Sequence, residues 1–169
     1  MLVRQLRAFL LPIVVAGVIP AGLAAWEHAP ARWPPPPAVS IVSLMLLAAG
    51  LYLLASTNRL FATEGAGTLV PWDPPSRLVL RGVYRHVRNP MITGVFLVIL
   101  AEALALASAA VTLWFAFAVL VNLVYIPLSE EPGLVRRFGE DYREYQRNVP
   151  RWIPRLTPWG GAAGRRPPK

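Results

Sequence analysis

Apolar residues are concentrated in four long runs that polar segments separate. The runs cover residues 8–25, 39–56, 91–107 and 110–128. A helix needs about 20 mostly apolar residues to cross a bilayer, so each run predicts one transmembrane helix. The third and fourth runs are almost contiguous, which predicts an antiparallel helical hairpin. We therefore expect an all-α, polytopic membrane protein with about four spans in a single domain, residues 1–169.

The first run also admits a different interpretation. Arg4 and Arg7 precede it, and a basic start followed by an apolar stretch is typical of a cleaved signal peptide. The run is long, however, and Pro20 interrupts it late. These features favour a span that is retained in the mature protein.

Two polar segments follow the second and fourth runs. Residues 57–90 form a predicted loop that is rich in proline, glycine and arginine. Residues 130–147 predict an amphipathic helix, because apolar side chains recur there every three or four positions: Leu134, Val135, Phe138, Tyr142 and Tyr145. This helix could lie on the membrane surface or cover the loop, and residues 156–169 read as a flexible tail.

Composition and charge agree with a membrane protein. Hydrophobic residues make up 55% of the chain and charged residues only 15%, whereas soluble domains are about 25% charged. The chain has no cysteine and only two histidines, so we do not expect a metal centre. The net charge of +8 fits a nucleic acid or a membrane surface, and the hydropathy favours the membrane, with no nucleic-acid partner.

The basic residues also predict an orientation. They gather in the 57–90 loop and after the fourth run, and positive residues mark the cytoplasmic side. An even number of spans then places both termini in the cytoplasm. We expect a multi-pass protein of the bacterial cytoplasmic (inner) membrane that contacts membrane lipids.

The segment RGVYRHVRNPMITG, residues 81–94, carries dense positive charge at the start of the third run. Asn89 and Pro90 predict a helix start, with Asn89 as the cap. Free amides at such a terminus could bind a carboxylate. The alternative is that Asn89 is an ordinary helix cap and that the neighbouring arginines and His86 contact lipid headgroups.

Three acids stand out against the apolar background. Glu130 and Glu131 directly follow the fourth run, and their carboxylates should find cations, for which Arg85 and Arg88 are candidates. The alternative is that they occupy the first turn of a helix capped by Ser129. Glu102 lies inside the third run, where it is either functional or reaches the far interface.

Two segments in this order carry a family resemblance. A GxYRxxRNPM segment, an apolar hairpin and then EEPxLxxxFGxxYxxYxxxVPRW resemble the isoprenylcysteine carboxyl methyltransferases and, more loosely, the phospholipid N-methyltransferases. The resemblance covers residues 67–154. It implies a helical membrane enzyme that uses S-adenosyl-L-methionine in a cytosol-facing pocket formed by the loop and the C-terminal helix, with a lipid-like substrate entering from the bilayer.

The same resemblance implies the site residues. The matching cofactor positions are Leu78, Val79, Tyr84, Asn89, Pro90, Met91, Ile92 and the acidic pair Glu130 and Glu131. Arg88 and Glu130 are the candidates for catalytic roles, because arginine can bind the cofactor's carboxylate and an acid can hold its positive charge.

The resemblance implies cofactor binding more directly than a particular acceptor. The carboxyl methyltransferases carry an arginine shortly before the acidic pair, where this chain is apolar near Ile126. The acceptor therefore stays open between a carboxyl and an amine. Two other functions stay open as well: a related NADPH-dependent membrane reductase, and a non-catalytic scaffold that binds anionic lipid.

Overall fold

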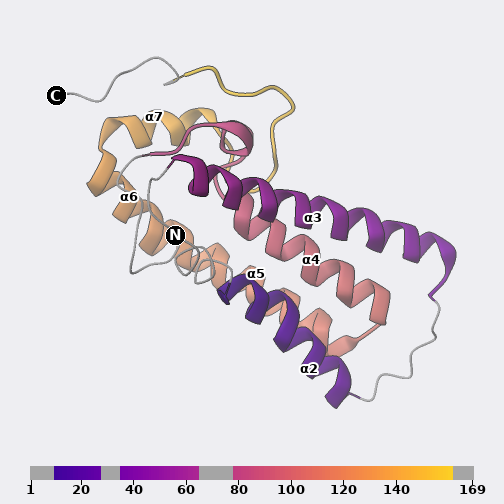
Figure 1. Ribbon diagram of the computed structural model, residues 1–169. Helices are drawn as coiled ribbons and strands as arrows, with labels where there is room; N and C mark the ends of the chain where they lie inside the picture. Colours follow the sequence, from indigo (N-terminus) through magenta and orange to yellow (C-terminus); the bar gives the residue numbers. More distant parts are fainter. Residues whose placement is uncertain (1–9, 28–34, 65–77, 162–169) are drawn as a thin grey trace.

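Apolar helices form a bundle, and shorter polar helices cap one end of it (Figure 1). The computed structural model describes residues 10–27, 35–64 and 78–161, and these contain helices but no strand. The first apolar helix, Leu10–Trp26, includes the π-helical turn η1 (Val14–Val18) and ends as α2 (Ile19–Trp26). It is followed by α3 (Pro37–Glu64), α4 (Pro90–Leu106) and α5 (Ala109–Tyr125). The predicted all-helical architecture is confirmed for this part of the chain.

The polar cap is formed by the loop before α4 and the segment after α5. It contains a 3₁₀ turn, η2 (Gly82–Arg85), the π-helical turn η3 (Ile126–Glu130), and helices α6 (Glu131–Phe138) and α7 (Glu140–Asn148). α5, η3 and α6 form one continuous helix, Ala109–Phe138. Pro127 lies in η3, and because proline has no backbone N–H to donate, the regular hydrogen-bond ladder is broken there.

α4 is the central helix of the bundle. It packs against α3 on one side and against α5 and α2 on the other (Figure 1). The α3–α4 contact depends on two glycines: a Cβ on Gly50 would lie 2.8 Å from the carbonyl oxygen of Gly94. Small residues at such a crossing let two membrane helices approach closely.

At the end of the bundle opposite the polar cap, α2 is joined to the start of α5. Glu27 accepts a hydrogen bond from the Ser108 hydroxyl, and its carboxylate accepts the N–H groups of Ala109 and Ala110, each at 3.2 Å. A carboxylate at a helix N-terminus satisfies amides that have no partner within the helix. The hairpin between α4 and α5 is thereby tied to the first helix.

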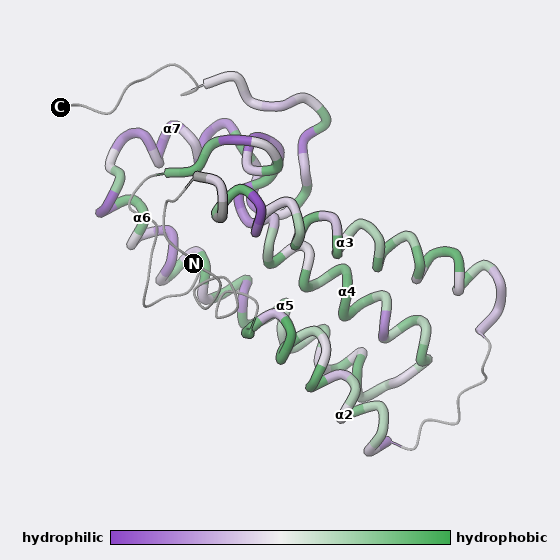
Figure 2. Tube along the Cα trace, viewed as in Figure 1, coloured by the Kyte–Doolittle hydropathy of each residue, from purple (hydrophilic) through white to green (hydrophobic). Residues whose placement is uncertain are grey.

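Among the described residues, two helices are long and apolar enough to cross a membrane, Pro37–Phe61 and Ala109–Phe138. The other two predicted spans correspond to shorter apolar helices, Leu10–Trp26 and Pro90–Leu106. Figure 2 shows the apolar residues along the bundle and the hydrophilic residues gathered at the capped end. Many large apolar side chains on the bundle are exposed, as expected for a surface that faces lipid. The protein is a helical membrane protein, and the prediction of four spans stays a prediction.

The structure corrects two predicted boundaries. Residues 57–64, predicted as part of the loop, continue α3, because no proline or glycine interrupts them. Ser129 does not begin a helix, since η3 carries the chain without a break into α6.

The C-terminal segment also differs from expectation. The helix predicted over residues 130–147 is divided at Gly139, whose φ of 58° favours glycine. Residues 156–161 belong to the predicted flexible tail, yet Trp159 is buried in the polar cap. The remaining tail, residues 162–169, lies outside the described residues.

Candidate functional site

Arg88 and Glu131 form a buried ion pair at the centre of the polar cap. Arg88 Nη1 lies 2.9 Å from Glu131 Oε1, and the two side chains are only 9% and 8% exposed. Arg88 lies two residues before Pro90, where α4 starts, and Glu131 is the first residue of α6. The sequence predicted that a loop arginine meets the acidic pair, and this contact is confirmed for Arg88.

Glu131 also binds the segment that follows α7. Arg151 donates from Nε to Oε1 and from Nη2 to Oε2, both at 2.8 Å, and Gln146 Nε2 donates to Oε2 at 3.1 Å. The hydrogen bond to Glu131 raises the pKa of Arg151. Both oxygens of Glu131 are therefore engaged by the protein. Arg151 was not predicted, although it lies in the VPRW motif of the resemblance.

Backbone hydrogen bonds join the loop to the C-terminal segment. Donors and acceptors pair between residues 85–88 and 150–159: Arg88 N to Pro150 O at 2.9 Å, Arg155 N to His86 O at 3.0 Å, and Trp159 N to Arg85 O at 2.9 Å. We call these two stretches the clasp. Arg85, predicted as a partner of the acids, instead donates from Nε to the Trp159 carbonyl at 2.6 Å.

The apolar face of α6 and α7 covers the loop. The five residues that predicted an amphipathic helix all belong to one cluster with Leu78, Leu80 and Trp159. We expected this helix either on the membrane surface or over the loop, and in the structure it covers the loop. Tyr145 also donates its hydroxyl to the Tyr84 carbonyl at 2.7 Å, and burial raises the pKa of Tyr142 to about 12.

Tyr84 is buried between α3 and the clasp. It packs edge-on against Phe61, with ring centroids 5.9 Å apart, and shares a cluster with Val79. Burial and then the negative charge of Glu130 raise the pKa of Tyr84, which the Thr57 hydroxyl partly offsets. The phenol of Tyr84 therefore stays protonated at neutral pH.

Unsatisfied polar atoms gather at the start of α4. Arg88 Nε, Asn89 Nδ2 and Thr93 Oγ1 are buried without a hydrogen-bond partner within the described part of the chain. Asn89 occupies the cap position as predicted, but its side chain makes no capping hydrogen bond. Buried donors are rarely left unpaired, so this group indicates a place for a polar ligand. Thr93 was not predicted, although it lies one helical turn beyond Asn89.

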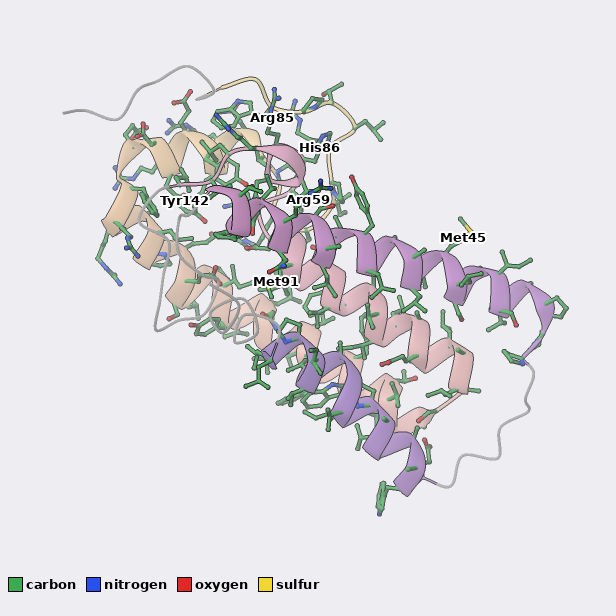
Figure 3. The ribbon with its side chains drawn as sticks, in the orientation of Figure 1. Met45, Arg59, Arg85, His86, Met91 and Tyr142 are labelled. Carbon is green, nitrogen blue, oxygen red and sulfur yellow. The ribbon has the colours of Figure 1, made fainter. Side chains whose placement is uncertain are left out.

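Some of the other predicted residues lie at the start of α4, and others lie away from it. Pro90 is buried, and Met91 and Ile92 are half-buried in the first turn of α4 (Figure 3). Glu102 lies near the other end of α4, away from the site, with Oε2 buried and unpartnered by any described residue. The His86 ring is bound through Nδ1 to the Arg155 carbonyl at 2.8 Å. The predicted pocket also involves residues 65–77, which lie outside the described residues, and it stays a prediction.

Comparison with known proteins agrees with this arrangement. A family model described as phospholipid methyltransferase matches residues 39–141, which is more than half of the chain and includes α3, α4, α5, Arg88 and both acids. The chain belongs to the phospholipid methyltransferase family. The family match therefore contains both partners of the Arg88–Glu131 ion pair.

A curated relative supports the same family. Residues of this chain are 34% identical over 77 positions to protein-S-isoprenylcysteine O-methyltransferase of Schizosaccharomyces pombe. The match covers 46% of this chain but only 33% of that protein. The chain therefore spans about a third of the relative it matches.

Proposed function

We propose that this protein is a methyltransferase that uses S-adenosyl-L-methionine. The acceptor would be a lipid-like or amphipathic molecule, methylated on a carboxyl oxygen or an amine at the cytoplasmic face of the membrane. One observation carries the proposal: within the family-matched segment, buried donors of Arg88, Asn89 and Thr93 that have no partner among the described residues gather at the start of α4. Family membership supplies the reaction class that this polar group would serve.

The residues around the start of α4 fit the chemistry of that cofactor. Its amino-acid end carries a carboxylate, which suits the guanidinium of Arg88 and the amide of Asn89 as donors. Its ammonium and sulfonium are positive, which suits the carboxylate of Glu130. Glu130 has no ion-pair partner among the described residues, so its carboxyl group remains free to pair with a cationic ligand. Leu78, Val79, Tyr84, Pro90, Met91 and Ile92 would supply the apolar surroundings.

When bound, S-adenosyl-L-methionine supplies a methyl group that a nucleophile can attack. Arg88 is held by Glu131, so its guanidinium has a fixed position and needs little reordering to bind a carboxylate. Glu130 would orient the positive end of the ligand beside Tyr84. In this arrangement Glu131 positions Arg88 rather than binding the ligand directly.

The state of Tyr84 bears on the acceptor. Because its pKa is raised, its phenolate is not available as a base at neutral pH. Tyr84 is therefore not the base that a protonated amine or a hydroxyl acceptor would need. A lipid-like acceptor would reach the site from the bilayer along the exposed apolar helices, and the arginine-rich cap would face the cytoplasm.

Titration of the detergent-purified full chain with S-adenosyl-L-methionine tests the proposal. The wild type should bind, and Glu130→Gln should bind at least about tenfold more weakly, since a tenfold change corresponds to about 1.4 kcal/mol. Asp141→Asn is the matched control, because Asp141 is an exposed acid in the first turn of α7. Equal binding by Glu130→Gln and wild type would remove Glu130 from the site, and binding of NADPH in place of S-adenosyl-L-methionine would favour a reductase.

A further inference from the structure

A concave surface lies on the outer side of α3, separate from the start of α4. This cavity, which we call the α3 groove, has a volume of about 540 Å³. α3 contributes five lining residues, among them Ser56 and Arg59, and the clasp and the turn before it contribute the rest, among them Arg85, His86 and Pro158. None of them belongs to the residues that we assign to the cofactor.

The α3 groove is cationic. Arg59 is exposed, and its guanidinium has no partner among the described residues. Arg85 uses Nε for the Trp159 carbonyl, which leaves its two terminal nitrogens for a ligand. His86 donates from Nδ1 to the Arg155 carbonyl, so Nε2 is an acceptor in the neutral ring and donates to an anion only when the ring is protonated. Figure 3 shows Arg59, Arg85 and His86 at the same end of α3, and the described lining contains no carboxylate.

Two arginines, Arg59 and Arg85, that converge on one cavity suit an anion with several acceptor oxygens. Arginine binds phosphate through a fork of N–H groups, and the Ser56 hydroxyl adds a further donor at the groove wall. The charge of the lining therefore selects a phosphate or a similar anion over a neutral or cationic group.

Apolar surface adjoins the α3 groove. Towards the start of α3, Leu44 and Met45 are 66% and 67% exposed, and Met45 projects away from the bundle (Figure 3). In the clasp, which contributes Pro158 to the groove, Ile153 and Leu156 are 80% and 98% exposed. Such side chains are expected where a surface meets lipid. The cationic groove thus lies where an apolar helix face gives way to polar residues, which is the level of lipid headgroups.

We propose that the α3 groove binds the phosphate of an anionic glycerophospholipid, whose acyl chains lie along the exposed apolar face of α3. A lipid bound here would contact both Arg59 of α3 and Arg85 of the clasp, and so link α3 to the segment that carries Arg88. The site goes beyond the proposed methyl transfer, since it shares no residue with the cofactor site and needs no reaction.

Native mass spectrometry of the full chain, reconstituted with equal amounts of phosphatidylglycerol and phosphatidylcholine, tests this site. The protein should retain phosphatidylglycerol in preference. Arg59→Gln should reduce that retention about fivefold, which corresponds to ~1 kcal/mol for an arginine at an anionic surface. Arg136→Gln, on the exposed side of α6, removes the same charge outside the groove and should leave retention unchanged.

Each contrary outcome is informative. Equal retention of the two lipids, or equal loss in Arg59→Gln and Arg136→Gln, would overturn the proposal. Displacement of phosphatidylglycerol by millimolar inorganic phosphate would identify free phosphate as the occupant and overturn the lipid. Ser56→Phe fills the groove without changing charge and should also reduce retention. Binding of S-adenosyl-L-methionine should be unaffected in Arg59→Gln, which separates this site from the proposed enzyme function.

Discussion

Two neighbouring glutamates have different environments in this protein. Glu131 is held by Arg88, Arg151 and Gln146, so that both of its oxygens are engaged. Glu130, one position earlier, has no ion-pair partner among the described residues. We interpret Glu131 as the residue that fixes the polar cap and Glu130 as the acid that remains for a ligand.

Glu131→Gln should destabilise the protein strongly. The substitution leaves Arg88 buried without its counter-charge, and breaking a buried ion pair typically costs about 3–5 kcal/mol. Thermal unfolding in detergent should show a midpoint lowered by several degrees. Glu140→Gln is the control, because its ion pairs with Arg143 and Arg147 are exposed and should contribute little. An unchanged midpoint for Glu131→Gln would refute the structural role of this residue.

The sequence identified part of this network and missed part of it. Arg88 and the acidic pair could be found, because charges beside apolar runs need partners. The sequence could not show that Arg88 pairs with Glu131 rather than with Glu130, or that Arg151 binds Glu131 through two nitrogens. Both contacts depend on how the chain folds back after α7. The same fold-back brings Arg85 to Trp159 rather than to the acids.

At the scale of the helices, the close packing of α3 against α4 fixes where α4 starts. It therefore also fixes the position of Arg88 and Asn89. A Cβ at Gly50 would lie 2.8 Å from both the Gly94 carbonyl oxygen and Val98 Cγ2. Backbone cannot move aside as a flexible side chain can, so the two helices would have to separate. That displacement would shift the start of α4, where the unpaired donors lie.

Gly50→Ala should therefore lower stability by about 1–3 kcal/mol, the usual cost of overpacking. Gly22→Ala is a matched control in α2, where an added Cβ meets nothing within 4 Å. Its stability should stay equal or rise slightly, since alanine is the better helix former by about 1 kcal/mol. Thermal unfolding of both variants checks this, and a tolerated Gly50→Ala would contradict the close α3–α4 approach.

Acid should weaken the junction between α2 and α5. The hydrogen bonds of Ser108 and then of the Ala110 and Ala109 amides hold the pKa of Glu27 below its usual value of 4.5, against a smaller opposing effect of burial. A carboxyl with a lowered folded pKa contributes stability above its unfolded pKa and loses it as the pH falls through the folded value. The difference in thermal midpoint between wild type and Glu27→Gln should narrow as the pH falls below 4.5. A difference that is constant with pH would exclude an ionised Glu27 as the cap.

At this scale the apolar runs were easier to predict than the helix ends. The start of α4 at Pro90 was predicted, because proline favours the first turn of a helix. The end of α3 was placed too early, because hydropathy marks where a chain leaves the membrane and Thr57, Asn58 and Arg59 can continue a helix in polar surroundings. Gly139 divides α6 from α7 through its backbone conformation, which the apolar spacing does not reveal.

The whole molecule combines an apolar bundle with a polar cap in which segments distant in sequence meet. The bundle supplies exposed apolar surface, and the clasp holds the start of α4 beside the acidic pair. This architecture suits an enzyme whose cofactor comes from water and whose acceptor comes from lipid. The bundle could be predicted from hydropathy alone, whereas the clasp depends on backbone hydrogen bonds that leave no pattern in the sequence.

The most direct test of the proposed function is transfer of isotope-labelled methyl from S-adenosyl-L-methionine to a lipid extract, followed by mass spectrometry. Membranes that contain the wild-type chain should yield a lipid-like product that gains one methyl group, and membranes that contain Glu130→Gln should yield far less at equal protein content. If no labelled product forms with the wild type, or if Glu130→Gln forms as much as the wild type, the account of this site is contradicted.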